Sequence, residues 1–387
     1  MAPKVLILSA SIGAGHTQAA HAIRDHYLIA NPMAQITIND FLAETGAVGT
    51  FIKNTYFKML DIFPDAYEFL YHWSQSTTHS SNVKDLTARI LKSHLLHLLA
   101  IQRPDLIIFT HPFPCCVAAY LRRTGLINVP MVAVLTDFSS HQLWIHREVD
   151  WYFVANKQVK RQLINSSIDD TIITVTGIPL SPAFRYKSIA VPPNSSDDLP
   201  TILVMGGGLG LGAIDKVVAD FSRVSSSCHL IVVTGKNRDL KKKLHSYRNR
   251  LLPHKITIIG YTRKIHELMA KANLLITKPG AVTCSEALAM ELPLLLYSPI
   301  PGQEEENAAY LVEQGAAIKI LPGESLAATV DTLLSHSESL SKMKQNASRL
   351  GQPNAAEKIV QTILQQLTQH HGSTTIRWRD EGTPLCK

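Results

Sequence analysis

The stretch TKPGAVTCSEALAMELPLLLYSPIPGQEEEN, residues 277–307, decides the fold of this chain. It holds the end of one apolar run, NLLIT (273–277), and all of a second, PLLLYS (293–298), and a Pro-Gly pair follows each run. Short apolar runs between breakers are typical of fully buried strands in a parallel sheet. The pattern therefore predicts an α/β domain in which two loops leave the carboxyl edge of one sheet, each leading into a helix.

The two predicted helix starts carry small and polar residues. They are Gly280, Ala281, Thr283 and Glu286 in the first helix, and Gln303, Glu304 and Asn307 in the second. Backbone N–H groups at a helix start suit a diphosphate, a carboxylate one turn in suits ribose hydroxyls, and amide and acid side chains suit the hydroxyls of a sugar. We interpret the stretch as a donor-binding pocket for a nucleotide sugar, although acidic residues in a first turn also serve helix stability alone.

The order Pro-Gly, Glu, Pro-Gly-Gln-Glu, Asn resembles the nucleotide-sugar half of the inverting GT-B glycosyltransferases. This group holds the lipid-II-forming N-acetylglucosaminyltransferase, the monogalactosyldiacylglycerol synthases and the processive diacylglycerol glucosyltransferases, and PGQEEEN (301–307) is most similar to the diacylglycerol branch. The resemblance implies a GT-B fold, in which two Rossmann-like doubly wound α/β domains face each other across a cleft. It also implies a UDP-sugar as donor substrate, with no cofactor and no metal ion.

The N-terminal residues form another phosphate-binding pattern. A buried-type strand, KVLIL (4–8), runs into a glycine-rich turn, and a helix is expected from Thr17. The segment SASIGAGHTQAAHAI (9–23) resembles the opening motif of the diacylglycerol transferases, in which the equivalent histidine lies beside the donor diphosphate and the acceptor hydroxyl. The resemblance places Gly15 and His16 at the site, with His16 either the catalytic base or a hydrogen-bond donor to phosphate.

The same turn leaves a dehydrogenase open as an alternative. Gly13-Ala14-Gly15 begins like a dinucleotide fingerprint, and Asp40, at the end of the next predicted strand, has the place of an acid that binds ribose. However, Gln18 stands where the third glycine of that fingerprint belongs. This departure favours the transferase interpretation.

Further candidate residues follow predicted strands in the first half. The strand 106–110 leads to His111 at its carboxyl end, and the strand 131–135 leads to Asp137. Asp137, followed by His141 and Trp144, resembles the family pattern T-D-[FY] followed by His and Trp. We expect Asp137 to orient the base or the acceptor hydroxyl, although a helix cap is also compatible. His111, His141 and Trp144 are expected on the acceptor side.

Residues 41–73, FLAETGAVGTFIKNTYFKMLDIFPDAYEFLYHW, are unusually rich in aromatic side chains for a connection in a doubly wound domain. One interpretation is a buried helix pair. The other is a surface that dips into lipid and leads an acyl-bearing acceptor to the cleft, because Trp, Tyr, Phe and Lys favour the membrane interface. The resemblance also implies an acceptor and membrane region in this part of the chain.

Composition and motifs divide the chain. We assign residues 1–190 to an acceptor-facing and membrane-facing domain, 191–200 (VPPNSSDDLP) to a linker, 201–370 to the nucleotide-sugar domain and 371–387 to a flexible tail. A glycine-rich turn at 206–213 adds Gly207 and Gly208 to the predicted donor site. The resemblance implies that Gly260 and Tyr261 bind the nucleotide base of the donor through backbone groups. After the predicted strand near 317–321, two helices are expected before residue 368.

The formal net charge of +7 is concentrated in one region. The stretch between residues 236 and 264 contains many Lys and Arg residues and a single acidic residue, Asp239. Such a face suits an anionic membrane surface or is simply solvated. Nucleic acid is not expected, because no recognised motif accompanies the basic residues. No apolar segment approaches the roughly 18 residues of a membrane-spanning helix, and no signal peptide is recognised. We therefore expect a peripheral protein on the cytoplasmic face of a membrane.

The five cysteines include no CxxC spacing, which predicts neither a disulfide framework nor a structural zinc site. Cys284, near a helix start, is not expected to act as a nucleophile, because direct displacement needs no covalent intermediate.

The resemblance implies an inverting hexosyltransferase that moves glucose or galactose from UDP-glucose or UDP-galactose to diacylglycerol, with repeated addition left open. A base at His16, helped by Asp137, takes the acceptor proton in a single displacement. The alternatives are a UDP-N-acetylglucosamine transferase acting on a polyprenyl-linked peptidoglycan precursor, a nucleotide-sugar epimerase, the dehydrogenase, and a catalytically inactive lipid-sensing module.

Overall fold

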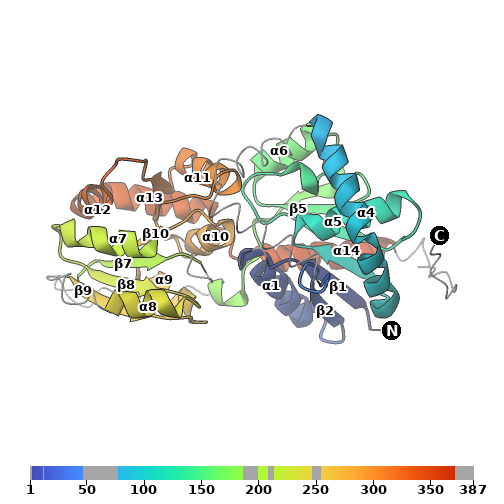
Figure 1. Cartoon of the computed structure of the whole chain (residues 1–387), viewed down its shortest axis with the longest axis horizontal. Coiled ribbons are helices and arrows are strands. Elements are labelled where there is room, and N and C mark those ends of the chain that lie inside the picture. Colours follow the sequence, from blue (N-terminus) through green and yellow to red (C-terminus); the bar gives the residue numbers. More distant parts are fainter. Residues whose placement is uncertain are drawn as a thin grey trace.

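The computed structural model describes residues 2–11, 13–46, 77–185, 199–207, 213–245 and 254–370. Within these residues the chain forms two parallel six-stranded sheets flanked by helices (Figure 1), which confirms the expected doubly wound α/β domains. Most of the aromatic-rich segment 41–73, residues 191–198 of the predicted linker, and the predicted tail lie outside the described residues. Among the described helices, none combines the length and the apolar content that a crossing of the bilayer requires.

The first sheet has the strand order β2-β1-β3-β4-β5-β6, with all neighbours parallel. Its elements are β1 (Lys4–Ser9), α1 (Gly15–Ala30), β2 (Gln35–Asp40), α4 (Thr77–Gln102), β3 (Leu106–Phe109), α5 (Pro112–Arg123), β4 (Met131–Val134), η1 (Gln142–Trp144), β5 (Trp151–Val154), α6 (Lys157–Asn165), η2 (Asp170–Ile172), β6 (Ile173–Val175) and η3 (Pro182–Phe184). The central strands are buried throughout, as their continuous apolar runs predict. The strand order reverses between β1 and β3, so the crevice for a ligand lies where α1 and α5 begin.

The second sheet has the order β12-β11-β10-β7-β8-β9, again all parallel. Its elements are β7 (Thr201–Met205), α7 (Ile214–Asp220), η4 (Phe221–Arg223), β8 (His229–Val233), α8 (Arg238–His245), β9 (Lys255–Ile259), α9 (Ile265–Lys271), β10 (Leu274–Thr277), α10 (Ala281–Ala289), β11 (Leu294–Leu296), α11 (Gln303–Glu313), β12 (Ala317–Lys319), α12 (Leu326–Ser335), α13 (Ser337–Leu350) and α14 (Ala355–His370). Both strands predicted in the stretch 273–298 are present as β10 and β11, and each leads into a helix. The reversal of order here lies between β7 and β10.

The chain after β12 differs from the prediction, because it forms three helices rather than two. The last break follows α13 at Gly351, where a Cβ would collide with the carbonyl oxygen of Leu288. From there α14 returns to the first sheet, and its apolar side chains pack with those of β1 and α1. Figure 1 shows α14 inside the lobe of the first sheet, although it follows the second sheet in sequence.

The two lobes share an apolar contact. Phe138 and Phe184 of the first lobe belong to the same buried cluster as Ala281 and Val282 at the start of α10. A Cβ at Gly15 would lie 3.2 Å from Cγ2 of Val282, so the starts of α1 and α10 approach closely. The crevices of the two sheets are thereby brought face to face.

Candidate active site

His16 lies at the start of α1, half-buried, with its ring orientation set by two contacts. Its Nδ1 is 2.8 Å from the carbonyl oxygen of Thr110 and 2.8 Å from Oγ1 of Thr136. Because a carbonyl oxygen can only accept, Nδ1 carries the proton and Nε2 keeps its lone pair. Burial lowers the pKa of His16 to about 4, against a smaller opposing effect of the Thr110 carbonyl. The imidazole is therefore neutral near pH 7 and can accept a proton at Nε2.

His111 stands against His16. The two ring centroids are 4.6 Å apart in an edge-to-face arrangement. His111 caps α5, and its Nδ1 accepts a hydrogen bond from the Phe113 N–H at 3.2 Å. Burial, and then the nearby His16, hold the pKa of His111 well below its usual value. The neutral ring of His111 thus packs against the ring of His16.

Thr136 was missed by the sequence reasoning, which singled out the neighbouring Asp137. Thr136 follows β4 at the carboxyl edge and is buried against His16. A hydroxyl residue just after a buried strand, at the carboxyl edge of the sheet, was the available signal. Its contact with His16 nevertheless joins residues 120 positions apart, which spacing along the chain does not reveal.

Asp137 faces the second lobe. Its Oδ1 accepts from Asn307 Nδ2 at 3.1 Å, and its Oδ2 accepts from Gln303 Nε2. Burial raises the pKa of Asp137 to about 6, with the two amides acting in the opposite direction. We expected Asp137 to orient the base or the acceptor hydroxyl. The contacts that orient His16 come from Thr110 and Thr136, whereas the Asp137 carboxylate contacts α11.

The start of α10 gathers several predicted donor-site residues. Gly280 is the N-cap residue, Ala281 opens the helix, and a Cβ at Gly207 would lie 3.9 Å from Oγ1 of Thr283. Gly207 has φ of +75°, a conformation that favours glycine. The glycine-rich turn after β7 therefore lies beside the α10 N-terminus, while Gly208 lies outside the described residues.

Glu286 lies one turn inside α10 and is 8% exposed. Burial raises the pKa of its carboxyl to about 8. A carboxyl in this state gains hydrogen-bond partners when hydroxyl donors enter the site, and such donors favour its ionised form. The geometry is compatible with the predicted contact to ribose hydroxyls.

The second Pro-Gly pair produces the start of α11. Gly302, its N-cap residue, has φ of +80°, which explains why glycine stands there. Glu304 forms a partly buried ion pair with Lys278 and also accepts from the Ile300 N–H at 3.0 Å. Lys278 was not singled out from the sequence. Its ammonium neutralises Glu304 between the starts of α10 and α11.

Gly260 and Tyr261 follow β9 on the far side of the second sheet. A Cβ at Gly260 would lie 3.7 Å from Nζ of Lys241. The Lys236 ammonium lies 5.8 Å from the ring centroid of the exposed Tyr261. Two cations, Lys236 after β8 and Lys241 on α8, therefore lie beside the loop that is predicted to hold the nucleotide base.

Two residues expected near the acceptor have other contacts. His141 is the N-cap residue of η1, and its Nδ1 accepts from the Leu143 N–H at 3.1 Å. Trp144 is 2% exposed and belongs to the first hydrophobic core. Its ring packs inside the domain rather than facing the cleft.

The hydrogen bonds of the Asp40 carboxylate argue against the dehydrogenase alternative. Its Oδ1 accepts from the backbone N–H groups of Ser11 and Ala43, each at 3.2 Å. The carboxylate therefore closes the loops after β1 and β2, leaving little reason for it to hold a ribose.

The described residues favour neither a cysteine nucleophile nor a metal site. Cys284 is fully buried, and burial raises the pKa of its thiol, so a thiolate is disfavoured. Across the same residues, no group of three or more His, Cys, Asp or Glu side chains is arranged to hold a metal ion.

Two family models match the chain. The model of monogalactosyldiacylglycerol (MGDG) synthase matches residues 16–180, and that of the glycosyltransferase family 28 C-terminal domain matches residues 201–363. A processive diacylglycerol β-glucosyltransferase of Bacillus thuringiensis (strain Al Hakam) is 33% identical over 370 residues, which cover 94% of each chain. The Bacillus mycoides (strain KBAB4) protein of the same name is 33% identical over 368 residues, 94% of this chain and 93% of that one.

Solved structures show the same architecture. MurG of Acinetobacter baumannii has a TM-score of 0.61 at 16% identity, covering 94% of this chain and 100% of that one. Anabaena HepE in complex with UDP-glucose has a TM-score of 0.53 at 16% identity, covering 96% and 100%. These neighbours are GT-B glycosyltransferases, and they confirm the predicted GT-B fold.

Proposed function

We propose a function from the family of this chain, which belongs with the monogalactosyldiacylglycerol synthases and the processive diacylglycerol β-glucosyltransferases. The proposed reaction is the transfer of a hexose from a UDP-sugar to diacylglycerol. The product is a glycolipid. Glucose is the sugar we favour, because the relatives at 33% identity are named as glucosyltransferases. Galactose is the second candidate, since the synthase model that matches residues 16–180 is named for it.

One observation carries the proposal. A neutral histidine of fixed tautomer, His16, lies at the start of α1, and that start approaches the start of α10 with Gly15 and Val282 in near contact. A proton acceptor and a diphosphate-binding helix N-terminus are therefore within reach of one bound substrate pair.

In this mechanism the acceptor hydroxyl gives its proton to Nε2 of His16 while its oxygen forms a bond to the anomeric carbon. The bond between that carbon and the UDP oxygen breaks, and UDP leaves with the electron pair. The N-terminus of α10, with Gly280 and Ala281, offers backbone N–H groups to the departing diphosphate. Glu286 holds the ribose hydroxyls, and Gln303 lies at the start of α11 towards the sugar. A single displacement of this kind inverts the anomeric configuration.

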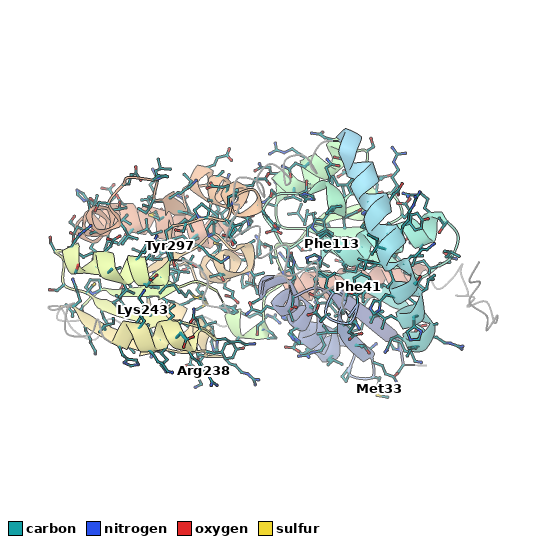
Figure 2. The ribbon with its side chains drawn as sticks, in the orientation of Figure 1. Met33, Phe41, Phe113, Arg238, Lys243 and Tyr297 are labelled. Carbon is teal, nitrogen blue, oxygen red and sulfur yellow. The ribbon has the colours of Figure 1, made fainter. Side chains whose placement is uncertain are left out.

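Diacylglycerol resides in a bilayer, so we also propose that the enzyme works as a peripheral protein on an anionic membrane surface. The helix α8 supports this proposal, since Arg238 and Lys242 are exposed on it. Figure 2 shows Arg238 at the lower edge of the second lobe. Such residues each add about 1 kcal/mol of attraction to an anionic leaflet. We expect salt-sensitive sedimentation with phosphatidylglycerol vesicles and weaker sedimentation with phosphatidylcholine vesicles. Equal sedimentation with both would contradict an electrostatic contact.

The transfer is tested with radiolabelled UDP-glucose and, separately, UDP-galactose, each incubated with diacylglycerol vesicles. Thin-layer separation should show labelled glycosyldiacylglycerol, with more label from UDP-glucose. Label that enters only a polyprenyl-linked peptidoglycan precursor would contradict the proposed acceptor. Interconversion of the UDP-sugars with no acceptor present would favour an epimerase instead.

A further inference from the structure

Three consecutive residues after β4 contact both lobes at the cleft. The Thr136 hydroxyl lies against His16 Nδ1 at 2.8 Å, on the first lobe. Asp137 and the Phe138 N–H both bond to the side chain of Asn307, at 3.1 and 2.9 Å, on the second lobe. The helix that carries Asn307, α11, lies at the junction of the two lobes (Figure 1). The segment 136–138 is thus a short physical link between the histidine and α11.

The side-chain amide of Asn307 is fully engaged in this link. Its Oδ1 accepts from the Phe138 N–H, and its Nδ2 donates to Asp137 Oδ1 and, at 3.3 Å, to the carbonyl oxygen of Pro279. An amide nitrogen has two hydrogens, and both are used here. Asn307 is also 0% exposed. We expected its side chain to bind a sugar hydroxyl, but in this arrangement no ligand atom can reach it.

Phe138 is held independently on its other sides. Its ring stacks on that of Tyr310, with centroids 5.2 Å apart and planes inclined by 20°. Its carbonyl oxygen accepts from Asn156 Nδ2 at 3.1 Å, and Asn156 also caps α6. The segment 136–138 is therefore held on several sides, and the Asn307 amide sets its position relative to α11.

We propose that Asn307 is a positioning residue for glycosyl transfer: its amide holds the segment 136–138 against the start of α11, so that His16 and the donor-binding helices keep a fixed separation. The inference rests on the proposed function, because it assigns His16 to the acceptor proton and α10 and α11 to the donor. A displacement of about 1 Å between reacting groups can cost roughly 10²-fold in rate. Asn307 should therefore act on turnover rather than on UDP affinity.

The first test is Asn307→Ala, assayed for glycolipid formation and for UDP binding by calorimetry. We expect kcat to fall about 10²-fold and the UDP dissociation constant to change by less than about threefold, which corresponds to roughly 0.65 kcal/mol. Asn346→Ala is the matched control, because it also removes an amide-to-carbonyl bond, from Asn346 Nδ2 to the Gly315 carbonyl at 3.0 Å, on α13. The control should keep the kcat of the wild type.

The pH profile supplies a readout that loss of packing alone would not move. The groups that act on Asp137 are the amides of Gln303 and Asn307, which favour its ionised form, and Glu304 and Glu306, which oppose it. Removing the Asn307 donor raises the pKa of Asp137 further, because one hydrogen bond to the carboxylate is lost. Because the Asp137 carboxylate accepts the hydrogen bonds that join the segment 136–138 to α11, its protonation weakens the same link. The acid limb of the kcat profile should therefore move to higher pH in Asn307→Ala and stay in place in Asn346→Ala.

An exchange of side chains keeps the inference testable if Asn307→Ala does not fold. Asn307→Asp sets two carboxylates against each other, whereas the double variant Asp137→Asn with Asn307→Asp again opposes an amide donor and a carboxylate. We expect the double variant to recover kcat at least about tenfold over Asn307→Asp, or about 1.4 kcal/mol. The absence of recovery would overturn the inference.

The remaining outcomes separate the inference from the function. If Asn307→Ala turns over within twofold of the wild type, Asn307 does not position the cleft, although the proposed function stands. If UDP affinity falls in proportion to kcat, Asn307 is a donor ligand and the inference is overturned. If the wild type itself neither binds UDP nor forms glycolipid, the proposed function is overturned, and the inference with it.

Discussion

The two carboxyl edges that meet at the cleft are built differently. At the first edge, His16 and His111 are made neutral by burial, and hydrogen bonds fix the tautomer of each ring. At the second edge, Glu286 is buried with its pKa raised to about 8. The first edge is thus ordered for proton transfer before a substrate arrives. The second is completed by the hydroxyls and phosphates of its ligand.

The largest effect is expected from a substitution at the first edge. His16→Ala removes the proton acceptor, and we expect kcat to fall about 10³-fold, within the range for a general base. UDP affinity should stay within about twofold of the wild type, as measured by calorimetry, because the donor contacts lie on the other lobe. His21→Ala, on the exposed side of the same helix, is the matched control. Near-normal turnover of His16→Ala would remove His16 from the chemistry.

The next largest effect is expected from a substitution at the second edge. Glu286→Ala removes the carboxyl that we propose binds the ribose hydroxyls, and hydrogen bonds to a charged group contribute about 1.5–3 kcal/mol each. We expect UDP affinity to fall about 10²-fold, with a smaller loss of kcat at saturating donor. Glu305→Ala, which removes an exposed acid paired with Lys319, is the control. Unchanged UDP affinity in Glu286→Ala would show that ribose is held elsewhere.

The pH dependence of stability sharpens the comparison. Between pH 4.5 and about 8 the Glu286 carboxyl is protonated in the folded protein and ionised in the unfolded chain. Unfolding then releases a proton, so the stability of the wild type falls as pH rises through this window. Glu286→Gln does not titrate. Its free energy of unfolding relative to the wild type should therefore increase between pH 5 and pH 8, on the order of 3 kcal/mol. Denaturant titrations at the two pH values measure this, and a constant difference would mean that Glu286 is ionised in the folded protein.

The smallest effect concerns the orientation of the base. Thr136→Val removes the hydroxyl beside His16 Nδ1 and leaves the Thr110 carbonyl in place. A single neutral hydrogen bond contributes about 0.5–1.5 kcal/mol, so kcat should fall by about tenfold at most. Thr176→Val is the control, because the Thr176 hydroxyl bonds to the Gly177 carbonyl instead. A loss as large as that of His16→Ala would mean that Thr136 itself takes part in proton transfer.

Local patterns predicted the sheet edges well. Runs such as LLIT and LIIF are typical of buried strands, and the Pro-Gly pair before α11 marked where that helix begins. The contacts that set the site were harder to predict, because they join distant residues. Thr136 with His16, and Asn307 with Asp137, depend on how the two lobes meet. Trp144 was misplaced for a related reason, since a family pattern fixes its position in the chain but not which way its ring packs.

The anomeric configuration of the product tests the central claim most directly. If His16 on one edge deprotonates the acceptor while the other edge holds the UDP-sugar, one displacement on the α-linked donor gives a β-glycosyldiacylglycerol. Proton NMR of the glycolipid made from UDP-glucose and diacylglycerol measures the coupling between the anomeric proton and the proton on the next ring carbon. The account predicts the large coupling of a β-glucoside. An α-linked product would contradict it, because a single displacement that inverts the α-linked donor cannot give an α-glycoside.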